Sequence, residues 1–244
     1  MDIRQIVMVS ELRDPIVQEL SNLFEFEVAF NDPGVSHFGL ENAVIPIGTD
    51  FLEVVSPVED NTTAGRFLKK RKGDGGYMVI IQVDDFDLSK SLVKENGIGV
   101  VWETDLPEAK AIHLHPKEMG GAILSLDWMN PKESWKWAGS DWKNHITGPI
   151  QGIDGVEIQS NEPDVMFSAW SEVLGNPRSD KEELKIYLDH TWIKFISEQD
   201  ERGAGIYSFS LKALNPEKIF DKAKKLGFFI DDGIKIGGIK FYMV

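Results

Sequence analysis

The sequence contains no cysteine among its 244 residues. This absence excludes disulfide bonds, thiolate metal ligands and a cysteine nucleophile. It also lacks any uninterrupted apolar run of the roughly 20 residues that a membrane helix needs. The first ten residues predict a strand containing Arg4, and no secretory signal is expected there. We therefore expect a cytoplasmic protein without a membrane partner, whose chemistry depends on oxygen and imidazole groups.

Positive charge is scarce, since 26 Lys and Arg face 40 Asp and Glu, for a net charge of -14. Such a balance repels nucleic-acid phosphates, so we expect no nucleic-acid partner. One basic run stands out at residues 69–72, and it predicts a solvated linker or, as the weaker alternative, a clamp for a phosphate-bearing ligand. The length suits two domains, and the 42% hydrophobic content is typical of a globular protein.

A strand, a helix and a closing strand recur four times along the chain. Three of the helices are predicted to begin at a polar residue followed by proline, at Asp14-Pro15, Glu162-Pro163 and Asn215-Pro216. The second helix is predicted after Asp84-Asp85. The closing strands are expected at residues 51–55, 122–126, 192–196 and 239–244.

The spacing within each repeat leaves room for further strands, which gives the fold class. We predict an α+β protein with four βαβββ modules, the last two trimmed, that pair into two curved-sheet cups. The domains are expected at residues 1–130 and 151–244, joined by a connector at 131–150. Modules could also pair across a homodimer. Four of the seven tryptophans lie between residues 128 and 150. They predict a connector packed between the domains or over a cup, with stacking on a ligand as the alternative.

Short motifs in the first two units carry a family resemblance. They are residues 3–7 (IRQIV), 51–55 (FLEVV), 83–85 (VDD), 115–117 (HPK) and 120–126 (GGAILSL). The pattern resembles the vicinal oxygen chelate superfamily, which includes glyoxalase I, bleomycin-resistance proteins, extradiol dioxygenases and methylmalonyl-CoA epimerase. The final motif looks most like the epimerase and glyoxalase-like branch. In the last two units the resemblance rests on the pattern of elements alone.

The resemblance implies a divalent metal held by residues from the first and closing strand of two modules. The matching positions are Gln5, Glu53, Met78 and Ser125. A thioether and a neutral hydroxyl are poor ligands for a hard dication, so we predict no cofactor and a degraded metal site. A divalent metal held by a rebuilt set is the alternative, with the residues Gln5, Glu53, His113 and His115.

Glu53 is the candidate catalytic residue. It shares a strand face with Phe51 and Val55, and desolvation between apolar neighbours would raise its pKa toward that of a useful general base. A glutamate that reaches solvent at a frayed sheet edge is the alternative. Gln5, on the opening strand of the same unit, is expected to hold the carboxylate. Tyr77 or Met78 is expected to form the opposite wall.

The histidines offer a second kind of candidate. His113 and His115 are two residues apart on a predicted strand, so their rings would project from the same side as a possible metal pair. His115 could instead cap a turn, and His37 could face the cup. The complete set of expected ligand-binding residues is Gln5, His37, Tyr77, Met78, His113, His115 and Ser125.

Two functions follow from this reading. The first is a protein that binds a small organic molecule in a sheet-lined cup, either without turnover, as the bleomycin-resistance proteins do, or with metal-free chemistry at Glu53. The alternative is a metal-dependent lyase, isomerase or dioxygenase of the same superfamily, which uses Glu53 with rebuilt histidine ligands.

Overall fold

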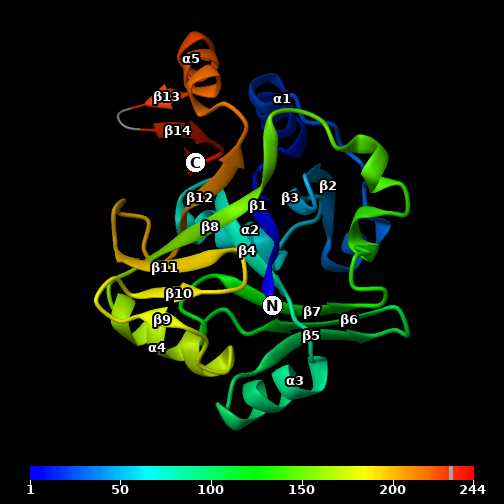
Figure 1. Ribbon diagram of the computed structural model, residues 1–244, viewed down its shortest axis with the longest axis vertical. Coiled ribbons are helices and arrows are strands. Elements are labelled where there is room, and N and C mark those ends of the chain that lie inside the picture. Colours follow the sequence, from blue (N-terminus) through cyan, green and yellow to red (C-terminus); the bar gives the residue numbers. More distant parts are fainter. Residues whose placement is uncertain (231–232) are drawn as a thin grey trace.

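The computed structural model describes residues 1–230 and 233–244. Within these residues the strands form one seven-stranded and one eight-stranded sheet, with helices at the top and at the bottom of the molecule in this view (Figure 1). No helix in this part of the chain is long and apolar enough to cross a membrane.

The first sheet contains the first two modules, in the strand order β2-β3-β1-β4-β7-β6-β5. Its two central strands, β1 and β4, pair antiparallel, and each also pairs in parallel with its own closing strand, β3 or β7. The elements are β1 (Asp2–Val9), α1 (Arg13–Phe24), β2 (Leu40–Ile47), β3 (Asp50–Pro57), β4 (Gly75–Gln82), α3 (Phe86–Glu95), β5 (Val100–Asp105), β6 (Ala109–Leu114) and β7 (Ile123–Met129).

The second sheet repeats this arrangement in the order β13-β14-β15-β12-β8-β11-β10-β9. Its central strands β8 and β12 pair antiparallel, and each pairs in parallel with β11 or β15. The elements are β8 (Ile150–Ser160), α4 (Pro163–Val173), β9 (Ser179–Asp180), β10 (Lys185–Tyr187), β11 (Trp192–Ser197), β12 (Gly205–Ala213), α5 (Pro216–Leu226), β13 (Phe229–Ile230), β14 (Gly233–Ile236) and β15 (Ile239–Met243). The predicted fold class is therefore confirmed.

The helix starts follow the sequence signals. Pro163 and Pro216 are the first residues of α4 and α5, where the missing N–H group costs nothing. The side chain of Asn215 accepts a hydrogen bond from the backbone N–H of Lys218, which caps α5. Gly227 ends α5 with a φ of 78°, a conformation that disfavours other residues.

Two local features differ from the expectations. The basic run at residues 69–72 is not a solvated linker, because residues 63–71 form the helix α2 (Thr63–Arg71), which the side chain of Thr62 caps. Arg71 is only 2% exposed, and its guanidinium donates to the backbone oxygen of Arg202 at 3.0 Å. In the first module, the 3₁₀ helix η1 (Pro33–Phe38) occupies the stretch before β2 where a further strand fits the repeat.

The two sheets share a core between them. One hydrophobic cluster joins residues of both sheets, such as Leu124 and Phe209, with residues of the helices, such as Leu20 and Trp170. The segment from 130 to 149 links β7 to β8. The division into two domains with a connector at 131–150 stays our proposal.

Candidate functional site

The inner face of the first sheet, which we call cup one, carries the four residues at the inherited metal positions. Strand register places Gln5 beside Phe51 and Ile80, and Ile80 beside Ser125. Residues paired across neighbouring strands point to the same face of a sheet. Gln5 and Ser125 therefore share one row across cup one.

Glu53 and Met78 form part of the adjacent row. Val7 pairs with Glu53 on one side and with Met78 on the other. The side chain of Met78 is 8% exposed and packs in the hydrophobic cluster of this face. The alignment of the four positions therefore puts them on one surface, within two neighbouring rows.

Glu53 is held by two amide groups. Gln5 Nε2 donates to Glu53 Oε2 at 2.7 Å, and Asn42 Nδ2 donates to Glu53 Oε1 at 2.6 Å. The glutamate is 7% exposed, and burial raises its pKa to about 7 although both hydrogen bonds act to lower it. The protonated and ionised forms therefore coexist near neutral pH, as a general base requires. The alternative of a solvent-exposed glutamate at a sheet edge disagrees with this burial.

Asp127 is a second buried carboxyl in cup one that our sequence analysis missed. Trp137 Nε1 donates to Asp127 Oδ2 at 2.7 Å, and the hydroxyl of Ser125 donates to Oδ1. The side chain is 1% exposed, and desolvation raises its pKa to about 7. Alternation along Ile123, Ser125 and Asp127 puts all three on one face, which was the signal available in the sequence.

The tryptophan-rich segment closes over cup one. Trp135 Nε1 donates to Gln5 Oε1 at 2.6 Å, and its ring stacks on Phe51 with centroids 5.7 Å apart and planes at 13°. Trp142 meets the same Phe51 edge-on at 4.9 Å. Trp135 and Trp142 are 1% and 4% exposed, so they fill the space above the sheet. Packing over a cup was one of the placements expected for this segment.

Tyr77 lies at an irregularity in the pairing of β1 with β4. Its ring meets Phe67 of α2 edge-on at 5.1 Å, and burial raises the pKa of its hydroxyl to about 12. Tyr77 and Met78 both belong to the hydrophobic cluster of cup one. The role of either residue as a wall against a ligand stays a prediction.

The histidines do not gather around Glu53. His113 packs against the rings of Trp102 at 4.5 Å and Phe38 at 6.4 Å, and burial lowers its pKa to about 4. His115 follows the end of β6, and its Nδ1 accepts a hydrogen bond from the backbone N–H of Lys117 at 3.2 Å. This contact is the turn cap that we considered for His115. His37 is exposed on η1.

Neither ligand set fits a divalent metal as the side chains now lie. Among residues 1–230 and 233–244 no three histidine, aspartate or glutamate residues group around a possible ion, so the rebuilt set with His113 and His115 is not assembled. In the inherited set, the oxygens of Gln5 and Glu53 already accept hydrogen bonds, and Met78 offers a thioether. The thioether of Met78 and the neutral hydroxyl of Ser125 are poor ligands for a hard cation, so two of the four positions do not suit one.

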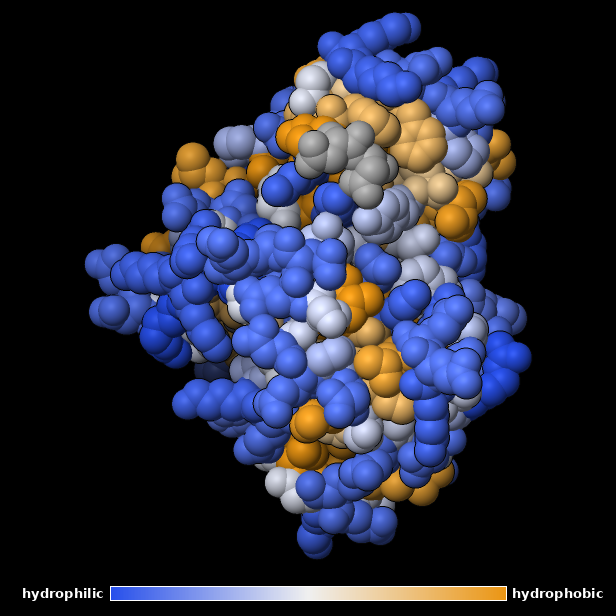
Figure 2. Space-filling view, turned by 90° about the vertical axis from the view of Figure 1, so that its left-hand side faces the viewer, coloured by the Kyte–Doolittle hydropathy of each residue, from blue (hydrophilic) through white to orange (hydrophobic). Residues whose placement is uncertain are grey.

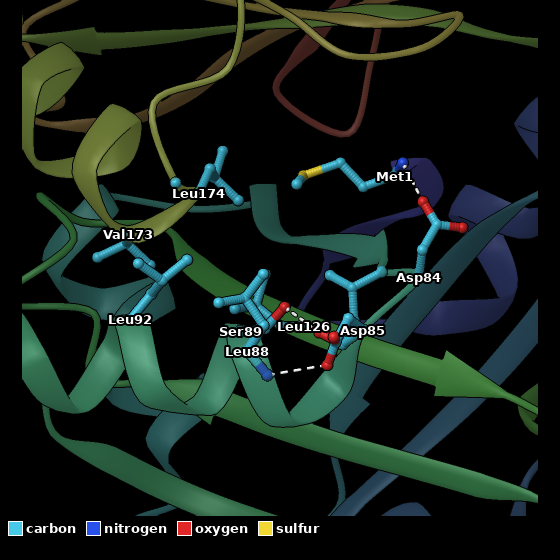
Figure 3. A pocket seen from close by; sticks show the side chains of 11 residues that line it. Met1, Asp84, Asp85, Leu88, Ser89, Leu92, Leu126, Val173 and Leu174 are labelled. Carbon is cyan, nitrogen blue, oxygen red and sulfur yellow. Dashed lines mark hydrogen bonds and ion pairs between the residues drawn. The ribbon is translucent and has the colours of Figure 1, made fainter.

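A cleft of about 230 Å³ lies away from this face, between α3 and α4 (Figure 3). Its wall is mostly apolar, and the amino group of Met1 binds Asp84 at one end at 2.8 Å. None of the predicted site residues lines it. One side of the molecule is mainly hydrophilic, with hydrophobic residues in separate small groups (Figure 2). Cup one therefore remains the candidate site that the sequence and the geometry share.

Comparisons with known proteins point to one group. No protein-family model matches the chain. Mitochondrial methylmalonyl-CoA epimerase of Bos taurus is 29% identical over 113 residues, which are 43% of this chain and 62% of the relative. The chain thus spans less than two thirds of the length of the curated relative that it matches.

Solved structures of methylmalonyl-CoA epimerases also resemble part of the chain. The Streptomyces coelicolor protein in complex with 2-nitronate-propionyl-CoA is 20% identical, with a TM-score of 0.48, over 55% of this chain and 99% of that chain. The Mycobacterium tuberculosis protein is 16% identical, with a TM-score of 0.47, over 57% of this chain and 92% of that chain.

The motifs of the first two units, the sequence match to an epimerase and the paired βαβββ modules agree with one another. Part of the chain is thus similar in sequence to a methylmalonyl-CoA epimerase, and its fold is the one that the resemblance to the vicinal oxygen chelate superfamily implies.

Proposed function

We propose that the protein binds a small carbonyl compound in cup one and that Glu53 moves a proton at the carbon next to the carbonyl. The observation that carries this proposal is the state of Glu53. It is buried, it is held in place by Gln5 and Asn42, and its pKa is raised to about 7. A carboxyl with that pKa both accepts and returns a proton near neutral pH.

The proton balance is simple. The ionised carboxylate of Glu53 takes the proton from the carbon, and the electron pair of that C–H bond moves into the carbonyl to form an enolate. The same carboxyl then returns a proton to the carbon, on either face. The N–H groups of Gln5 and Asn42 donate to the two oxygens of Glu53 and hold the carboxylate in place for this transfer, and Trp135 in turn donates to the amide oxygen of Gln5.

Ligand entry requires the tryptophan-rich segment to move, because Trp135 and Trp142 occupy the space above Phe51. This segment contains only two short 3₁₀ helices, η2 (Lys136–Ala138) and η3 (Trp142–His145). It has no sheet pairing of its own between β7 and β8, so its displacement leaves both sheets intact. We infer that the ligand takes the place of one or both indole rings.

A thioester is our first choice of ligand class, because the relatives are named for an epimerase of methylmalonyl-CoA. A thioester carbonyl acidifies the neighbouring C–H group, which suits a carboxyl base. The exposed Lys69 and Lys70, at the end of α2, offer positive charge for the phosphates of such a ligand. This is the phosphate clamp that we considered for that basic run.

The test is solvent exchange. Methylmalonyl-CoA is incubated with chelator-washed protein in deuterium oxide, and deuterium at the acyl C2 position is measured by mass spectrometry against a protein-free blank. We expect exchange above the blank, lost in Glu53→Gln and kept in Glu59→Gln, which changes an exposed carboxyl six residues later. The shorter thioester with N-acetylcysteamine tests the acyl part alone.

Three results would count against this function. Equal exchange by the Glu53→Gln variant would remove Glu53 from the reaction. Exchange that appears only after a divalent metal is added would favour the metal-dependent lyase, isomerase or dioxygenase reading. Binding of the thioester without exchange would leave small-molecule binding and contradict the proton transfer.

A further inference from the structure

The inner face of the second sheet, which we call cup two, consists of two rows of side chains across five strands. Register through β10, β11, β8, β12 and β15 defines both rows. The first row is Lys185, Lys194, Glu157, Ser208 and Lys240. The second row is Tyr187, Trp192, Gly155, Ser210 and Tyr242.

The same register shows which residues of cup two correspond to those of cup one. Glu53 lies on the closing strand beside the first strand of its module, and Lys194 has that place on β11. By the same comparison of strand register, Gly155 on β8 corresponds to Gln5 on β1. The position of the buried base in cup one is therefore occupied by an ammonium group in cup two, so the charge is reversed.

Cup two is also open where cup one is covered. The side chain of Lys194 is 34% exposed, and Tyr187, Trp192 and Tyr207 are half-buried. Glu53, at the corresponding place in cup one, is 7% exposed beneath the tryptophan-rich segment. A small molecule can reach the side chains of cup two without moving a segment of the chain.

Positive charge and aromatic rings are interleaved on this face. Lys185 Nζ lies 4.3 Å from the ring centroid of Trp192, Lys240 Nζ lies 5.6 Å from that of Tyr207, and Arg178 stacks on Tyr187 at 4.4 Å. This concentration is unusual for a chain with a net charge of -14. It makes cup two complementary to an anion that carries a flat ring.

Three acidic groups of this face are engaged by neighbours. Asp180, which lies opposite Lys185 on β9, accepts hydrogen bonds from the backbone N–H groups of Glu182 at 2.9 Å and Glu183 at 3.1 Å. Asp154 Oδ2 accepts from Trp192 Nε1 at 2.8 Å and from Ser210 at 3.0 Å. Glu157 Oε2 accepts from Ser208 at 2.7 Å. Their hydrogen bonds hold the floor of cup two in place.

Lys185 and Lys194 lie directly opposite each other on β10 and β11. Like charges in this relation repel. On their other sides Asp180 lies opposite Lys185 and Glu157 lies opposite Lys194, and Glu183 is 4.0 Å from Lys194. An anion bound between the two ammonium groups would relieve this repulsion. The pair therefore indicates where the carboxylate of a ligand binds.

The position of the Trp192 ring depends on a glycine in the neighbouring strand. Trp192 lies flat across β8 at Gly155, and a Cβ atom there would be 2.2 Å from the ring. Glycine is thus needed for the indole to lie on the sheet. With its N–H held by Asp154, the ring has a fixed orientation toward Lys185.

We propose that cup two is a second ligand site, which binds a small organic anion with a planar ring. Its carboxylate lies between Lys185 and Lys194, and its ring packs against Trp192. This site does not depend on the function proposed for cup one.

The probe is 4-fluorobenzoate, titrated into the full-length protein and followed by fluorine NMR and calorimetry. We expect saturable one-site binding that weakens as salt is added, with the neutral 4-fluorobenzamide binding about tenfold more weakly or worse. Lys194→Met and Lys185→Met are each expected to lower the affinity by about tenfold, and Lys194→Arg to retain most of it. Lys222→Met, on α5, is the matched control and keeps wild-type affinity.

Several results would overturn the site. Equal binding of the amide, non-saturable binding or an unchanged affinity in Lys194→Met would each exclude an anion site. A dimer in sedimentation that Lys194→Met dissociates would also exclude it, since a second copy of the chain would then cover this face. Deuterium exchange at cup one separates the two proposals. Lys194→Met is expected to leave that exchange unchanged, so one proposal can fail while the other holds.

Discussion

Trp135 Nε1 and Gln5 Oε1 lie 2.6 Å apart, although 130 residues separate them in the sequence. Gln5 in turn donates to Glu53, and Asn42 donates to the other oxygen of the same carboxyl. The segment that covers cup one is thus linked to the candidate base by a chain of buried hydrogen bonds. The position of the tryptophan-rich segment and the hydrogen bonding of Glu53 are therefore coupled.

Removal of the indole N–H tests this link. Trp135→Phe keeps a ring over Phe51 and leaves the buried oxygen of Gln5 without its donor. We expect the free energy of unfolding, measured in urea, to fall by about 1–3 kcal/mol. Trp128→Phe, at a half-buried site on β7, is the control and should change stability less. Equal losses in both variants would show that the hydrogen bond contributes nothing specific.

The raised pKa of Glu53 predicts a pH dependence of stability. The folded protein holds this proton up to about pH 7, whereas the ordinary pKa of the group is 4.5. Between these values the folded state binds more protons than the unfolded state, so the free energy of unfolding falls as pH rises. Above about pH 7 this contribution is fully lost.

Urea denaturation at several pH values from about 4.5 to 8 measures this effect. In Glu53→Gln the share of the fall that comes from Glu53 should disappear, while the share from Asp127, whose pKa is also raised to about 7, should remain. Parallel curves for wild-type and variant would contradict the raised pKa of Glu53.

Arg202 is expected to hold the loop before β12 against the end of α2. Its guanidinium donates to the backbone oxygens of Arg71 at 2.8 Å, Gly73 at 3.1 Å and Gly238 at 3.0 Å. Lysine lacks this fork of donors, so Arg202→Lys should cost about 3 kcal/mol of unfolding free energy, measured in urea. Arg66→Lys, on the exposed side of α2, serves as the control. A loss of the same small size in both would refute the role of Arg202.

Gly155 allows a further test on the second sheet. Gly155→Ala places a methyl group 2.2 Å from the Trp192 ring, so we expect a loss of about 1–3 kcal/mol in thermal or urea unfolding. The tryptophan fluorescence should change as the indole leaves the sheet. Gly233→Ala, on β14, is the control and should change stability little, because a Cβ atom there would lie 3.7 Å from its nearest neighbour. An unperturbed Gly155→Ala variant would mean that Trp192 does not lie across β8.

The repeated modules could be predicted because their signals are local. Alternation marks the closing strands, and a polar residue before proline marks helix starts such as Pro163 and Pro216. Helix α2 was missed because only a few of its residues, such as Ala64 and Leu68, are apolar and buried, while its end is a run of positive charge. A basic, weakly apolar segment has the pattern of a linker.

The candidate site could be predicted only in part, because some of its contacts have no local signal in the sequence. Glu53 and Gln5 were expected together because the repeat aligns their strands. The partners Asn42 and Trp135 have no such signal, since an amide on a neighbouring strand or an indole 130 residues away becomes a neighbour only through tertiary packing. Ser125 was expected from the family resemblance, and the alternation that puts Asp127 on the same face as Ser125 had not been applied to this strand.

Fluorine NMR of protein labelled with 5-fluorotryptophan tests the central claim, that cup one opens to take a ligand beside Glu53. The resonances are assigned by single Trp→Phe variants, and methylmalonyl-CoA is then added to saturation. We expect the resonances of Trp135 and Trp142 to shift while that of Trp192 stays in place. Unchanged resonances for Trp135 and Trp142, with or without a shift of Trp192, would contradict it.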